Sequence, residues 1–356
     1  MSKFLNESLQ GLQSYTPGEQ PKDKKYIKLN TNESPFAPSD KVLKAIDESV
    51  ISDLKLYCDP ECTKLINAFC DVFNITPKNV IFGNGSDEIL DYCFYGFCSK
   101  ENSVVFPDIT YGFYKVFGDL YNIDYTEIPL NEDFQVDIND YIGINKNIVI
   151  ANPNAPTGIC LSVEQIEKIV ASNPDNIVII DEAYIDFGGT SCYPLTSKYN
   201  NLIVTGTFSK SRSLAGARLG FAIANEELIK DLNKIKYSTN PYNINALTQA
   251  VGTATLKDND YYIENCKKII QNREFTVKSL EKIGFSVLPS SANFVFAKCD
   301  GFSGEDLYKA LYEKGILVRH FKQTRIKDFL RITIGTKDEM TALINALKEV
   351  IENERS

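Results

Sequence analysis

Short apolar runs, most followed by a polar turn or a helical stretch, recur through the first two thirds of this chain. They are Val80–Phe82, Ser103–Phe106, Asn147–Ala151, Ile177–Ile180 and Leu202–Thr205. Helical patterns over Asp87–Cys98 and Val163–Ala171 separate some of them. Apolar strands that alternate with helices are typical of a mainly parallel sheet that is covered on both faces. The pattern therefore predicts an α/β protein.

The pattern changes in the last hundred residues, where a long helical segment over about 264–283 precedes a more mixed region. The expected strands there are Phe285–Leu288, Phe294–Ala297, Ile316–Val318 and Arg331–Ile334, and the expected helices cover about 304–314 and 337–353. A chain of 356 residues is long enough for two domains. We expect an N-terminal arm over residues 1–28, a large domain over 29–250 and a smaller α+β domain over 251–356.

Charge and side-chain chemistry argue against several kinds of function. The 38 basic and 47 acidic residues give a net charge of −9, which argues against nucleic-acid or membrane binding. The single histidine, His320, excludes a multi-His metal site and argues against a Ser-His-Asp arrangement. We therefore expect no metal, and any acid–base chemistry must use Lys, Asp, Glu or Tyr.

The cysteines and the start of the chain bear on its location. Nine cysteines are scattered without a Cys-x-x-Cys pair, and the first ten residues are polar. No apolar run approaches the ~18 residues of a membrane span. We expect a soluble cytoplasmic protein whose thiols serve as small apolar side chains.

Two of the apolar strands lead into side chains that suit chemistry. Lys210 follows Leu202–Thr205 within Thr207-Phe208-Ser209-Lys210, and Asp181 follows Ile177–Ile180 directly. Ligand sites in open α/β sheets lie at the carboxyl ends of strands. A lysine there can form a Schiff base, and a buried carboxylate needs a cationic partner such as the ring nitrogen of pyridoxal phosphate. The plainer alternatives are a solvated lysine and a helix-capping aspartate.

Three glycine- or proline-rich segments follow other strands. They are Gly83–Glu88, Asn152–Gly158 and Leu214–Gly220. The first is a strand-to-helix junction whose free backbone N–H groups can bind a phosphate or simply cap a turn. It matches neither the Walker sequence nor the dinucleotide fingerprint. Arg218, in the third segment, can add positive charge beside a phosphate.

The order and spacing of these five segments resemble the fold-type I pyridoxal-phosphate aminotransferases, and most of all the histidinol-phosphate aminotransferase family. The resemblance begins at Leu29-Asn30-Thr31-Asn32-Glu33-Ser34-Pro35 and ends at Leu330-Arg331-Ile332-Thr333-Ile334-Gly335, so it covers nearly the whole chain. It implies a large domain with a mainly parallel seven-stranded sheet between helices and a smaller α+β C-terminal domain. It also implies a homodimer with shared active sites.

The resemblance assigns roles to individual residues. Lys210 forms the Schiff base with pyridoxal phosphate and moves the Cα proton, Asp181 pairs with the pyridine nitrogen, and Tyr184 hydrogen-bonds the phenolic oxygen of the ring. The other implied cofactor contacts are Tyr111 on the ring face, Gly85, Ser86, Asp87, Thr207, Ser209 and Arg218 at the phosphate, and Tyr57 at the phosphate of the neighbouring subunit. The implied substrate contacts are Arg331, Arg319, Tyr15 and Asn32. Salt bridges are the alternative role for the two arginines.

The chain departs from the family pattern at two positions. Ala155 stands where the family commonly has the Asn that bonds the phenolic oxygen of the ring, so either Asn154 replaces that residue or Tyr184 acts alone. Cys58 stands where Pro is usual beside Tyr57.

The implied reaction interconverts L-histidinol phosphate plus 2-oxoglutarate and imidazole-acetol phosphate plus L-glutamate. An aromatic amino-acid aminotransferase and a threonine-phosphate decarboxylase of the same fold share the cofactor residues and stay open as alternatives. A non-catalytic regulator on this fold is disfavoured, because the family motifs begin at Leu29 and the chain is acidic.

Overall fold

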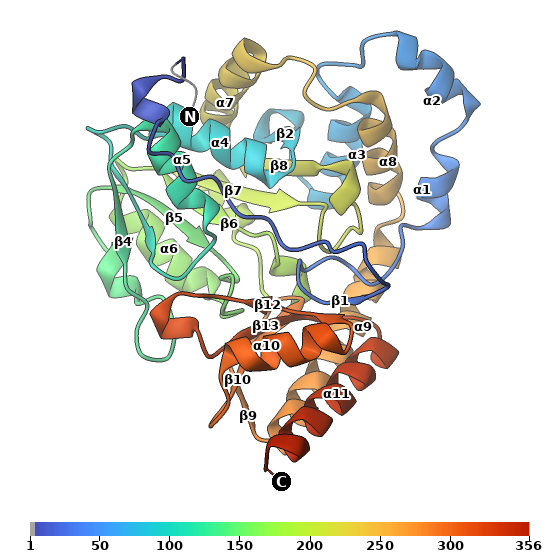
Figure 1. Ribbon diagram of the computed structural model, residues 1–356. Helices are drawn as coiled ribbons and strands as arrows, with labels where there is room; N and C mark the ends of the chain where they lie inside the picture. The colour runs from blue at the N-terminus through green and yellow to red at the C-terminus, as the bar shows by residue number, and fades with distance from the viewer. Residues whose placement is uncertain (1–3, 356) are drawn as a thin grey trace.

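The computed structural model describes residues 4–355, which form a large unit and a smaller one below it (Figure 1). The large unit contains a seven-stranded sheet in the order β2-β8-β7-β6-β5-β3-β4. Only β8 is antiparallel to its neighbours, and the other pairs are parallel. The strands are β2 (Val80–Asn84), β3 (Val104–Pro107), β4 (Tyr125–Ile128), β5 (Asn147–Ala151), β6 (Val178–Asp181), β7 (Leu202–Thr207) and β8 (Leu219–Ala224). The α/β class with a mainly parallel seven-stranded sheet is confirmed.

Helices cover both faces of this sheet. Val149 and Ile179 pack toward α4 (Ser86–Phe97), α5 (Phe113–Tyr121) and α7 (Glu226–Thr239). Their neighbours Ile148 and Ile180 pack toward α6 (Val163–Ser172), while α3 (Thr63–Phe73) and α8 (Ala246–Leu256) cover β2 and β8. Side chains alternate between the faces of a strand, so burial of both faces explains why these runs are apolar throughout.

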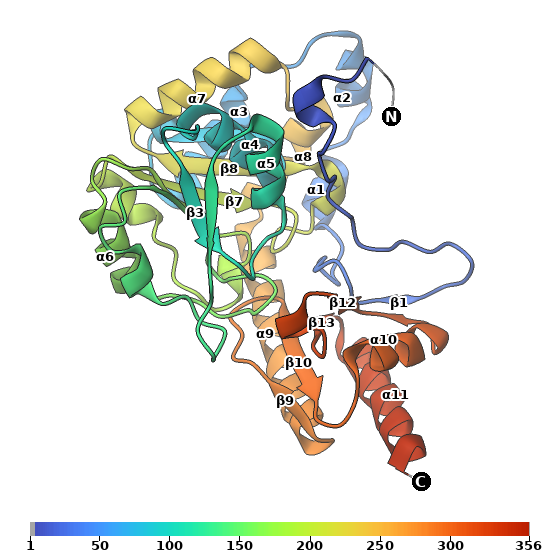
Figure 2. The ribbon, with the colours of Figure 1, turned by 60° about the vertical axis from the view of Figure 1, so that its left-hand side comes forward.

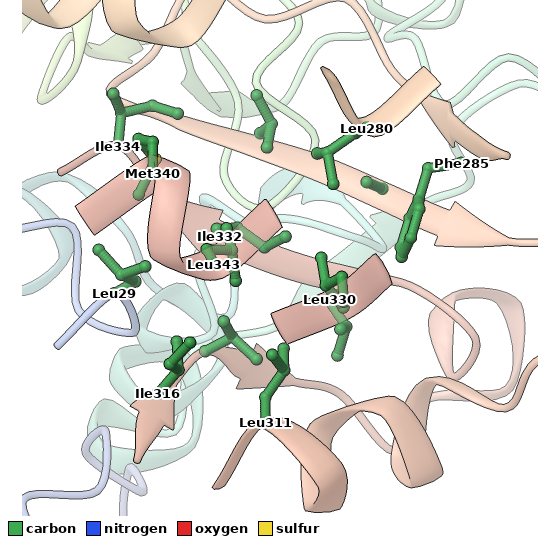
Figure 3. Close-up of a cluster of buried hydrophobic side chains, with 14 of the residues drawn as sticks. Leu29, Leu280, Phe285, Leu311, Ile316, Leu330, Ile332, Ile334, Met340 and Leu343 are labelled. Carbon is green, nitrogen blue, oxygen red and sulfur yellow. The ribbon is translucent and has the colours of Figure 1, made fainter. Parts of the chain in front are cut away.

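The smaller unit confirms the α+β expectation. Its strands β12 (Arg319–His320), β13 (Leu330–Thr333), β10 (Phe294–Cys299) and β9 (Phe285–Val287) form an antiparallel sheet in that order. The helices of this unit are α9 (Asn259–Lys282), α10 (Gly304–Glu313) and α11 (Lys337–Arg355). Leu280, Leu311 and Leu343 from these helices meet Leu330 and Ile332 of β13 in the core (Figure 3).

The N-terminal segment packs against the smaller unit. Its strand β1 (Ile27–Lys28) pairs in parallel with β11 (Ile316–Leu317), and Leu29 is buried in the core of the smaller unit (Figure 3). Residues before β1 form a loop that extends from the body (Figure 2), and the short helices α1 (Asp40–Lys44) and α2 (Glu48–Ser52) follow at an edge of the large unit (Figure 1). The division into domains at residues 28 and 250 stays a prediction; residue 250 falls inside α8.

The sequence pattern does not pick out β4 and β8. β4 is half-exposed at the edge of the sheet, so it lacks a continuous apolar run. β8 follows β7 without an α-helix between them and returns antiparallel, as strands joined by a short connection do.

All nine cysteines are free thiols. Within residues 4–355, no helix combines the length and apolar character needed to cross a bilayer.

Candidate active site

One cavity of about 720 Å³ is lined by both units and by the N-terminal arm. The ends of three neighbouring strands reach it through Ala151, Asp181 and Thr207, because the carboxyl ends of β5, β6 and β7 lie at one edge of the sheet. Most of the residues singled out in the sequence line it: Tyr15, Asn32, Ser86, Asp87, Tyr111, Asp181, Tyr184, Thr207, Ser209, Lys210, Arg218, Arg319 and Arg331. The lining leaves out Gly85, Asn154 and Tyr57.

The carboxylate of Asp181 is buried at the end of β6. The Tyr114 hydroxyl donates to Oδ2 at 2.9 Å, and the Thr205 hydroxyl donates to Oδ1 at 3.2 Å. Burial raises the pKa of Asp181 to about 6, although these two hydrogen bonds lower it. Among residues 4–355, Asp181 forms no ion pair, so its carboxylate suits a cationic group that enters the cavity.

Lys210 follows β7 and is partly buried. Its Nζ donates to the backbone oxygen of Thr31 at 3.1 Å and lies 5.7 Å from the ring centre of Tyr184. The Tyr184 hydroxyl in turn accepts a 3.0 Å hydrogen bond from Asn32 Nδ2. The amine and the phenol thus share one wall of the cavity with the N-terminal segment.

The N-terminus of α4 forms a narrow cradle beside these groups. Gly85 has φ +79, and a Cβ there would approach Arg218 Nη2 to 2.4 Å. A Cβ on Gly220 would lie 2.2 Å from the backbone nitrogen of Ser86. Only glycine fits these two positions, and helix N-termini with free N–H groups bind phosphates.

Charged and hydroxyl groups surround this cradle. Arg218 Nη2 lies 2.8 Å from Asp87 Oδ2, and the Tyr111 hydroxyl donates to Asp87 Oδ1 at 2.8 Å. Burial and the nearby Asp87 raise the pKa of Tyr111, so its phenol stays protonated. The buried hydroxyls of Thr207 and Ser209 lie 3.0 Å apart and line the same cavity.

Two arginines bring positive charge from the smaller unit. Arg331 Nη2 donates to the Asn30 backbone oxygen at 3.0 Å, whereas its buried Nε has no hydrogen-bond partner among the described residues. A planar guanidinium with a free donor suits a carboxylate. Arg319 Nη2 lies 3.5 Å from the Thr16 oxygen of the arm, and the Tyr15 ring packs on Tyr111 at 6.0 Å.

The structure does not bring Asn154 or Tyr57 into the cavity. Asn154 Nδ2 donates to the Ile109 oxygen at 2.9 Å and to Thr157 Oγ1 at 3.1 Å, and its Oδ1 accepts from Thr110, so the amide is fully used inside the wall. Tyr57 is 83% exposed and stacks on Tyr242.

Sequence reasoning missed several side chains that support the site. Tyr114 and Thr205 hold Asp181, and Thr333 holds Asn32. Tyr114 lies three residues after Tyr111, on the first turn of α5, and that spacing is the signal that could have found it. No group of three or more His, Cys, Asp or Glu side chains in residues 4–355 is arranged to hold a metal ion.

The groups in the cavity fit one kind of ligand. A buried carboxylate without a cationic partner, an amine and a glycine-lined helix N-terminus suit a planar ring that carries a cationic nitrogen, a carbonyl and a phosphate.

Comparison with known proteins agrees with a ligand of this kind. The family model of class I and II aminotransferases matches residues 24–347. A histidinol-phosphate aminotransferase of Brachyspira hyodysenteriae is 51% identical over 99% of this chain and 100% of its own length. One of Clostridium beijerinckii is 47% identical over 99% of each chain.

A solved structure is similar as well. The histidinol-phosphate aminotransferase from Sinorhizobium meliloti, in complex with pyridoxal-5'-phosphate, has a TM-score of 0.84 and 26% identity, and the match covers 93% of this chain and 92% of that one. The present chain is therefore an aminotransferase of class I and II, and within that class it belongs to the histidinol-phosphate aminotransferase family.

Proposed function

We propose that this protein is a pyridoxal-phosphate-dependent aminotransferase that interconverts L-histidinol phosphate plus 2-oxoglutarate and imidazole-acetol phosphate plus L-glutamate. The observation that carries the proposal is that a single cavity contains Lys210, Asp181, Arg319 and Arg331. The names of the relatives supply the substrate, and the full-length match supports carrying it over.

The geometry supports a proposed set of cofactor contacts. Asp181 would hold the ring nitrogen, Tyr111 the ring face and Tyr184 the phenolic oxygen. The phosphate would be held by Ser86, Asp87, Thr207, Ser209 and Arg218, with Gly85 leaving room for the close approach. When bound, pyridoxal phosphate supplies an electron sink that stabilises negative charge at the substrate Cα.

The residues of this chain then orient the substrate and move its proton. Arg331, whose Nε has no hydrogen-bond partner among the described residues, binds the carboxylate of glutamate, and Arg319 binds the phosphate of L-histidinol phosphate. Lys210 Nζ takes the Cα proton of the amino substrate and delivers it to the former aldehyde carbon of the cofactor, so that the amino group is transferred. The other lysine in the lining, Lys115, is paired with Glu127 at 3.0 Å, so Lys210 is the available base.

Substrate choice is tested by steady-state kinetics with glutamate as the amino donor. We expect the highest kcat/KM for imidazole-acetol phosphate. A preference for phenylpyruvate would replace this substrate with an aromatic one, and release of carbon dioxide from threonine phosphate would identify a decarboxylase.

We also propose a homodimer in which Tyr57 reaches the phosphate site of the partner. Large apolar side chains are exposed on α1, on α2 and in the segment that follows them to Tyr57, and α1 and α2 lie at one edge of the large unit (Figure 1). Exposed apolar patches of this kind are typical of subunit interfaces. The exposed side chains are Leu43, Ile46, Ile51, Leu54, Leu56, Tyr57 and Tyr242.

Hybrid dimers test the shared site. Tyr57→Ala and Lys210→Ala chains are each expected to be inactive or nearly so. Mixing them and allowing exchange should restore activity, because one site of each hybrid then has both native residues. A monomer in sedimentation experiments, or no restoration in proven hybrids, would contradict the proposal.

The proposed place of action is the cytoplasm. Nine free thiols are compatible with a reducing compartment, where amino-acid biosynthesis takes place. Fractionation of cells that express a tagged chain tests this location.

A further inference from the structure

We propose that Asn32 is a positioning residue that directs the hydroxyl proton of Tyr184 into the cavity, and that Thr333 sets the amide of Asn32 in the orientation this requires. The inference rests on the proposed function, since the acceptor for that proton is the phenolic oxygen of pyridoxal phosphate. It gives Asn32 a role different from the substrate contact that the family resemblance implies.

Asn32 is held on every side. It is 1% exposed, and its φ of +57 lies in the left-handed region, which Asn adopts more readily than most residues. Its backbone N–H donates to Thr333 Oγ1 at 3.0 Å, and its backbone oxygen accepts from Asn293 Nδ2 at 2.9 Å. Its side chain spans from Thr333 Oγ1 to the Tyr184 hydroxyl, at 3.0 Å on each side.

These contacts determine which way each proton points. Thr333 Oγ1 accepts the Asn32 N–H, so its own proton remains to be donated to Asn32 Oδ1. Asn32 Nδ2 therefore faces Tyr184 and must donate to it, because an amide nitrogen accepts no hydrogen bond. The Tyr184 hydroxyl oxygen is then occupied as an acceptor, and its proton is directed away from Asn32, into the cavity.

The direction matters because neither Ala155 nor Asn154 can take the place of Tyr184. Ala155, which lines the cavity, has no polar side-chain atom, and both donors of Asn154 are used inside the wall. Of Tyr184, Ala155 and Asn154, only Tyr184 has a side-chain donor left for the phenolic oxygen. A phenol whose oxygen accepts a hydrogen bond is also a stronger donor, since hydrogen bonds in a chain polarise one another.

The same strand holds Arg331 and Thr333. The two residues are two positions apart on β13, so their side chains lie on one face of the strand, and Arg331 donates to Asn30 while Thr333 bonds Asn32.

The charged and titratable groups that face Tyr184 are Lys210, Arg331, Tyr15, Tyr111 and Tyr114. None of the five is substituted in the variants below.

The test is a spectroscopic pH titration of the protein reconstituted with pyridoxal phosphate. Thr333→Val removes the hydroxyl with little change in shape and frees the Asn32 amide to turn. The hydrogen bond from Tyr184 to the phenolic oxygen favours the form of the chromophore that lacks a proton. Losing this bond should therefore raise the pH at the midpoint of the titration by about one unit, which corresponds to the free energy of one hydrogen bond. Thr333→Ser keeps the hydroxyl and should titrate like the wild type.

Two further variants keep the test decisive if Thr333→Val folds poorly. Asn32→Gly retains the backbone conformation and should raise the midpoint as Thr333→Val does. Ala155→Asn, added to either variant, places a new donor beside Tyr184 and should lower the midpoint again. A midpoint unchanged in both Thr333→Val and Asn32→Gly would overturn this inference while leaving the proposed function intact. A wild-type protein that forms no chromophore would overturn the proposed function itself.

Discussion

The Tyr114 hydroxyl donates a 2.9 Å hydrogen bond to Asp181 Oδ2, linking the first turn of α5 to the carboxyl end of β6. Tyr114 is fully buried, so the bond is shielded from water. It favours the ionised form of Asp181, the form that can pair with a cationic ring nitrogen. A residue that does not line the cavity thereby favours the ionised form of a carboxylate that does.

Tyr114→Phe should therefore weaken binding of pyridoxal phosphate. Losing a hydrogen bond to a charged group costs about 1.5–3 kcal/mol, or roughly 10- to 100-fold in Kd. The measurement is a fluorescence titration of the cofactor-free protein. Tyr121→Phe is the matched control, because its hydroxyl bonds the carboxylate of Asp91, which does not line the cavity. Equal affinities for the two variants would contradict the role of Tyr114.

Arg331→Lys should lower kcat/KM for glutamate by about 10²-fold, since a lysine cannot reproduce the two parallel bonds of a guanidinium to a carboxylate. Arg331 lines the cavity, and among the described residues its buried Nε has no hydrogen-bond partner. Arg273→Lys serves as the control, because Arg273 is also in the smaller unit but donates to the Phe187 and Ala292 oxygens outside the cavity. An unchanged kcat/KM in Arg331→Lys would remove Arg331 from the substrate site.

The raised pKa of the buried Glu182 carboxyl group predicts that folding stability depends on pH. The carboxylate accepts from Ser191 and from the Cys192 N–H at 2.8 Å, yet burial raises its pKa to about 7, above the ordinary value of 4.5. Between these values the folded protein holds a proton that the unfolded chain has released. Stability therefore falls as pH rises through this window, by up to about 1.4 kcal/mol per pH unit from this group.

Urea unfolding of the cofactor-free protein between pH 5 and 7.5 measures this slope. The Glu182→Gln variant lacks this titrating carboxyl group. Its folding stability should therefore decline less steeply with pH than that of the wild type. Glu101→Gln is the control, because Glu101 is exposed and its pKa is lowered, so it titrates below this window. If Glu182→Gln declines as steeply as the wild type, the assignment to Glu182 is wrong.

The sequence predicts the buried parts of the fold well. The run Asn147–Ala151 coincides with β5, and the runs at 177–180 and 202–205 fall within two residues of β6 and β7. These strands are covered on both faces, so their apolar character is continuous and easily found. The edge strand β4 carries the exposed residues Thr126 and Glu127 and lacks that signal.

Side-chain direction is where prediction from spacing ends. Ala155, and not Asn154, lines the cavity, because Asn154 bonds Ile109 and Thr157 inside the wall. The bond between Asn32 and Tyr184 joins residues 152 positions apart, and the one between Thr333 and Asn32 joins residues 301 apart. No local pattern encodes such contacts, since they depend on how the smaller unit packs beside the large one.

The most direct test of the central claim is to find where pyridoxal phosphate attaches. The protein is incubated with the cofactor, reduced with borohydride, digested and mapped by mass spectrometry. The proposed function predicts one pyridoxyl-phosphate group, on the peptide that contains Lys210, and none in Lys210→Ala protein of unchanged circular dichroism. Attachment at another lysine, or no attachment at all, would contradict it.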